Sequence, residues 1–91
     1  MRQLSTLEFS AQLASPFTNR EPASSEILLD GKPTGMIVTG AVLEAALEWQ
    51  GYRIAFLTDD IPFEDVLRIY MFDGDMNLVV QSRLVIDAFD E

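Results

Sequence analysis

Carboxylate and amide oxygens recur at every second position of the segment 73–77, which reads DGDMN. Oxygen-bearing side chains at this spacing begin calcium-binding loops, because a hard cation prefers oxygen ligands. The match stops at Leu78, which stands where such a loop needs a glycine. Asp-Gly is also a common turn sequence. The segment therefore predicts a turn with no bound cofactor, and it leaves Asp73, Asp75 and Asn77 as candidate calcium ligands.

Acidic side chains concentrate in the C-terminal third of the chain. The sequence has 15 Asp and Glu against 6 Lys and Arg, a formal net charge of −9, and residues 59–91 carry −7 of it. Such a charge repels a phosphate backbone, so direct binding to nucleic acid is not expected. Complementary charge would instead favour docking on a basic protein. The predicted partner-binding residues are Asp59, Asp60, Glu64, Asp65, Asp73 and Asp75.

Histidine and cysteine are both absent from the sequence. Ser-His-acid and Cys-His nucleophiles, His- or thiolate-ligated zinc sites and disulfides are therefore excluded. Paired carboxylates could act as general acid and base, but they need a cleft that raises the pKa of one of them. A domain of this size has little room for such a cleft. We expect a protein that is not an enzyme.

The chain of 91 residues fits one domain, residues 1–91, and 48% of its residues are hydrophobic and available for a core. Its first residues mix polar and apolar types, unlike the apolar run of a signal peptide. No stretch has the apolar length that a membrane span needs. We expect a soluble, cytoplasmic protein that does not bind membranes.

The strongest indication of the fold lies in residues 41–58. Ala, Leu and Glu dominate the first half, as in helices, but its apolar residues alternate as in a strand. A two-residue turn at Gln50 and Gly51 would match every pair across the two strands chemically. These pairs are Trp49 with Tyr52, Glu48 with Arg53, Leu47 with Ile54, and Ala45 with Phe56. We predict a hairpin whose apolar pairs face the core and whose salt pair faces solvent.

Further strands are expected within 26–29, 35–39, 66–72 and 76–82, where β-branched and aromatic residues lie between turn sequences. Residues 15–25 read as a loop. Six to seven such strands predict a mainly β domain, an antiparallel sandwich or small barrel. Gly40 lies between two of the strands, where it could bend the chain from one sheet into another.

The segment 5–13 can be interpreted in two ways. Leu7, Phe9 and the following apolar residues alternate with polar ones, which favours a half-buried strand. Ser5 with Glu8 three residues later also spells a helix capping box. The strand is the interpretation we favour.

Three functional hypotheses follow from these features. The first is a non-enzymatic, inhibitor- or immunity-type protein whose acidic end docks on a basic partner, although the same charge fits a merely solvated surface equally well. The second is a structural β-module that forms a homodimer through sheet edges or an exposed aromatic face, with few charges to protect the edge near 35–40. The third is a weak calcium-binding domain.

Overall fold

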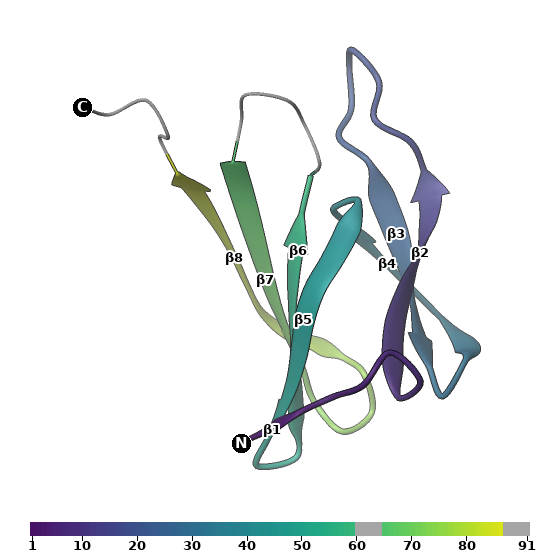
Figure 1. Cartoon of the computed structure of the whole chain (residues 1–91), viewed down its shortest axis with the longest axis vertical. Coiled ribbons are helices and arrows are strands. Elements are labelled where there is room, and N and C mark those ends of the chain that lie inside the picture. The colour runs from purple at the N-terminus through teal and green to yellow at the C-terminus, as the bar shows by residue number, and fades with distance from the viewer. Residues whose placement is uncertain (60–64, 87–91) are drawn as a thin grey trace.

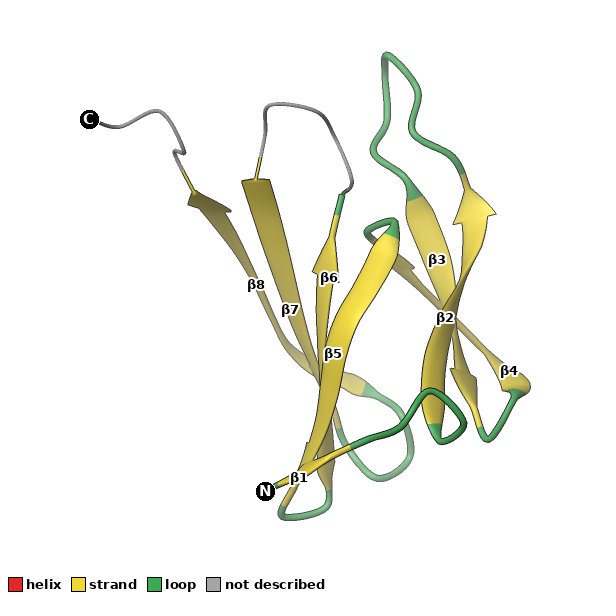
Figure 2. Ribbon diagram, viewed as in Figure 1, coloured by secondary structure: helices red, strands yellow, loops and turns green. Residues whose placement is uncertain are grey.

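The computed structural model describes residues 1–59 and 65–86, in which eight antiparallel strands form two sheets and no helix occurs (Figure 2). The larger sheet has the strand order β1-β5-β6-β7-β8, and the smaller sheet has the order β2-β3-β4. The strands are β1 (Arg2–Gln3), β2 (Phe9–Ser15), β3 (Ser24–Leu29), β4 (Lys32–Thr39), β5 (Val42–Trp49), β6 (Tyr52–Thr58), β7 (Asp65–Phe72) and β8 (Leu78–Ile86).

This architecture confirms the predicted antiparallel β fold. The two sheets are not closed into a barrel, and Figure 1 shows them as separate layers with β8 on the side away from the smaller sheet. The eight strands exceed the expected six to seven because β1 has only two residues, too few to leave a periodic pattern. The described part of the chain therefore has no helix that is long and apolar enough to cross a membrane.

The predicted β5–β6 hairpin has the predicted register, with all four pairs from Trp49–Tyr52 to Ala45–Phe56 in place. The faces, however, are the reverse of the prediction. Ala46 and Ala55 are buried against the smaller sheet, whereas Leu47 and Ile54 point to the other face and are only half-buried. Small residues fit at positions 46 and 55 of the inner face because bulky core side chains, among them Phe9 of the opposite sheet, fill the space between the layers.

Residues 5–13 combine both interpretations of that segment. The Ser5 backbone N–H donates to the Glu8 carboxylate (3.1 Å) and the Glu8 N–H donates to the Ser5 hydroxyl (3.3 Å), as in a capping box. Only a single turn forms, and β2 then begins at Phe9. Leu7 lies in that turn and is 83% exposed, so its expected place on the buried face was wrong. The loop predicted at 15–25 spans 16–23 between β2 and β3.

Gly40 carries the chain from the smaller sheet into the larger one, as predicted. Its φ is +136°, and a Cβ built there would lie 2.8 Å from the Cβ of Leu57. Beside it, the Tyr70 hydroxyl donates a hydrogen bond to the Thr39 carbonyl (2.8 Å). This crossing point therefore joins the two layers through close packing and a hydrogen bond. The core around it consists of Leu4, Phe9, Ile27, Val38, Ala46, Ala55, Leu57, Tyr70 and Phe72.

Candidate functional site

The residues predicted to bind a basic partner do not form one surface. Asp59 follows β6 and Asp65 begins β7, whereas Asp73 and Asp75 lie in the turn after β7, at the opposite end of the sheet (Figure 1). The eight residues of β7 separate the two groups by roughly 25 Å. Asp60 and Glu64 lie outside the described residues.

Asp59 is turned inward and already has a partner. Its carboxylate accepts hydrogen bonds from Nε and Nη2 of Arg68 at 2.7 and 2.9 Å, a fork-shaped ion pair. The side chains are only 3% and 14% exposed. The hydrogen bond from this pair raises the pKa of Arg68 further above its ordinary value. Asp59 therefore holds the sheet together at this end and is not available to an external partner.

Asp73 organises the β7–β8 turn. Its carboxylate accepts the backbone N–H groups of Asp75 and Asn77, both at 2.9 Å, and the side-chain amide of Asn77 at 3.2 Å. The backbone hydrogen bond from Asn77 is the main reason why the pKa of Asp73 is lowered. Both carboxylate oxygens thus serve the turn. In the described part of the chain no group of three or more His, Cys, Asp or Glu side chains could hold a metal ion.

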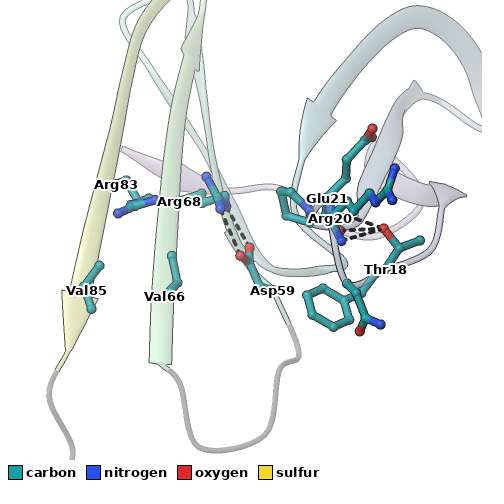
Figure 3. A pocket seen from close by; sticks show the side chains of 11 residues that line it. Thr18, Arg20, Glu21, Asp59, Val66, Arg68, Arg83 and Val85 are labelled. Atoms are coloured by element: carbon teal, nitrogen blue, oxygen red, sulfur yellow. Dashed lines mark hydrogen bonds and ion pairs between the residues drawn. The ribbon is translucent and has the colours of Figure 1, made fainter.

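A groove opens where β7 and β8 extend past the smaller sheet (Figure 3). Its floor consists of two cross-strand pairs, Arg68 with Arg83 and Val66 with Val85. Its wall is the loop 17–22 between β2 and β3, and its volume is about 410 Å³. The groove combines guanidinium groups with apolar side chains.

The edge strand β8 is the second exposed feature. Every described side chain from Leu78 to Val85 is exposed. Leu84 and Val80 lie on the outer face, and Val85 lies on the groove side. The apolar residues that are more than a third exposed are Leu78, Val79, Val80, Leu84 and Val85. A run of apolar side chains along an unpaired edge is unusual for a protein that exists alone.

Comparisons of the chain with protein-family models, with curated proteins and with solved structures found no match. What the protein does must therefore be inferred from the groove and from the exposed edge strand β8.

Asp59 lines the groove, but the other residues of these two features were not among those predicted from the sequence. The 76–82 strand was expected, but its exposure depends on the smaller sheet having three strands against five in the larger one, which periodicity does not reveal. The sequence did contain one usable signal: the segment 78–86, LVVQSRLVI, has a single charge. Apolar residues on both faces of a strand indicate that both faces are covered, by this chain or by another.

Proposed function

We propose that this protein is a non-enzymatic structural module that forms a homodimer, in which β8 of one copy pairs antiparallel with β8 of a second copy. The observation that carries the proposal is the exposure of every described side chain of β8. Pairing at this edge would satisfy its outward backbone groups and join two five-stranded sheets into one.

The order of residues along β8 supports a second copy as the partner. A two-fold axis through Ser82 would set this residue opposite its own counterpart, Val80 opposite Leu84, and Val79 opposite Val85. Gln81 would face Arg83, so the two copies of the single charged residue would not be directly opposite each other. The strand is therefore self-complementary in size, polarity and charge, as a two-fold interface requires.

The other sheet edges have features that oppose pairing. β1 has two residues, one of them Arg2, and β2 has a register shift between Leu13 and Ser15. β4 carries Lys32 and Pro33 among its exposed residues. Short length, irregularity, lysine and proline all discourage strand addition. Self-association is therefore proposed at β8 and not at the edge near 35–40 that the sequence suggested.

The test uses single cysteine variants, since the natural chain has no cysteine to interfere. In Ser82→Cys the two thiols of the dimer face each other across the axis, close enough for a disulfide. In the matched control Val80→Cys, on the same face of the strand, the two thiols are offset by four residues, roughly 14 Å. We expect wild-type dimers by light scattering at micromolar concentration, and covalent dimers on mild oxidation for Ser82→Cys only.

A monomeric wild-type protein would overturn the proposal. Faster cross-linking of Val80→Cys than of Ser82→Cys would overturn the register. Docking of the acidic residues on a basic protein has weaker support, because Asp59 is buried and the remaining described acids of that set lie at two ends of the sheet.

A further inference from the structure

The floor of the groove places two guanidinium groups side by side. Arg68 and Arg83 are directly opposite on β7 and β8, and both side chains line the groove. Like charges facing each other across a ladder destabilise it. Both carboxylate oxygens of Asp59 bind Arg68. Among the side chains that the structure describes, those of residues 1–59 and 66–85, no carboxylate forms an ion pair with Arg83. Asp59 balances the charge of Arg68, so an anion bound in the groove would balance the charge of Arg83.

The charge of the lining agrees with an anionic ligand. The groove residues include Arg20, Arg68 and Arg83 against Glu21 and Asp59, which gives three positive and two negative groups, a net of +1. The whole chain has a net charge of −9. Half of the six basic residues of the protein therefore meet in this groove. Figure 3 shows Arg20 and Glu21 on the opposite side of Asp59 from Arg83.

The neighbouring pair of the floor is apolar. Val66 and Val85 lie two residues along their strands from Arg68 and Arg83, a separation of about 7 Å on one face of a sheet. Phe17 and Pro22 add apolar surface from the loop. The volume of about 410 Å³ lies in the range of small-molecule sites. A ligand that contacts both the arginine pair and the valine pair of the floor has one anionic end and an apolar body several carbons long.

We propose that this groove binds a small carboxylate with an apolar body, with the carboxylate on the guanidinium of Arg83 and the apolar body over Val66 and Val85. A planar guanidinium holds a carboxylate through two parallel hydrogen bonds. The Arg68 guanidinium lies next to the proposed carboxylate position, and its own charge is balanced by Asp59. Arg83 and Val85 also belong to the β8 edge of the proposed homodimer, so the ligand site adjoins that interface.

The test is a titration with hexanoate followed by amide resonances in ¹H–¹⁵N NMR spectra of the full chain. We expect saturable shifts at Val66, Arg83 and Val85, with weaker binding of acetate, which lacks the apolar body, and of 1-hexanol, which lacks the charge. Arg83→Gln should weaken hexanoate binding on the order of tenfold. Lys32→Gln, an equal loss of charge on β4 outside the groove, should leave it unchanged.

Several outcomes would overturn the site: no shifts with hexanoate at millimolar concentration, equal binding of 1-hexanol, or equal effects of the two substitutions. The molecular mass of Arg83→Gln in solution is measured in parallel. A variant that still dimerises but no longer binds hexanoate supports the ligand site and separates it from the function of the β8 edge.

Discussion

Two oppositely charged side chains form a nearly buried ion pair at the base of the groove. Asp59 follows β6 and Arg68 lies on β7, and they form a fork-shaped ion pair with their side chains nearly buried. A buried ion pair is costly to break, because the remaining charge loses its partner without regaining water. The strand register places Arg68 opposite Arg83, and the pair with Asp59 holds the guanidinium of Arg68 through two hydrogen bonds.

Removing one partner of this pair should destabilise the fold. We expect Asp59→Ala to lower the free energy of unfolding by about 3 kcal/mol, measured by urea denaturation followed by circular dichroism. Glu48→Gln is the control, because its ion pair with Arg2 is longer (3.4 Å) and exposed and such pairs contribute little. Equal decreases in the free energy of unfolding of the two variants would show that the burial of the Asp59–Arg68 pair does not increase its contribution to stability.

At the scale of elements, the change of sheet between β4 and β5 depends on one residue without a side chain. We expect Gly40→Ala to cost at least about 2 kcal/mol, because its φ of +136° is unfavourable for alanine and its methyl group would meet Leu57 at 2.8 Å. Gly74→Ala is the matched control: the nearest atom to its added Cβ is 3.9 Å away, and its effect should stay within about 0.5 kcal/mol. Thermal and urea denaturation of both variants, compared with wild type, decide the matter.

Local signals in the sequence were sufficient for the turns and for one register. Gln50-Gly51 and its flanking pairs predicted the β5–β6 hairpin residue by residue, because both backbone and side-chain matching act over a few positions. Which face was buried could not be predicted in the same way. That depends on Phe9 and its neighbours in the other sheet, and these interactions are distant in sequence. The groove likewise needs the register of β7 with β8, which is shifted between Met71 and Phe72.

At the scale of the whole molecule, the response to pH should be confined to acid. The chain has no histidine to titrate near neutrality. The pKa of Glu8 is lowered from 4.5, chiefly by the Ser5 backbone N–H, and that of Asp73 from 3.8, chiefly by the Asn77 backbone N–H. A carboxyl group with a lowered pKa in the folded state stabilises the fold above its ordinary pKa, and this contribution is lost as the pH falls through the lowered value.

We therefore expect the urea midpoint to be nearly constant from pH 8 to about 5.5 and to fall below about pH 4.5. Asp73→Asn keeps an oxygen that can accept the turn's backbone N–H groups but does not titrate, so its midpoint should fall less steeply. Asp75→Asn is the control, since the hydrogen bonds described for the turn converge on Asp73. Parallel curves for wild type and Asp73→Asn would contradict the assigned role of Asp73.

The topology also sets an order of events during synthesis of the chain. The strands β2, β3 and β4 are consecutive, so the smaller sheet can pair as soon as residue 39 has left the ribosome. Residues 2 and 3, although made before the smaller sheet, find their partners only when residues 47 and 48 have been added. Of the strands that the structure describes, β8 comes last. Its apolar edge is thus presented to other molecules only after the rest of both sheets has been made, which shortens the time in which an unfinished chain could pair there with the wrong strand.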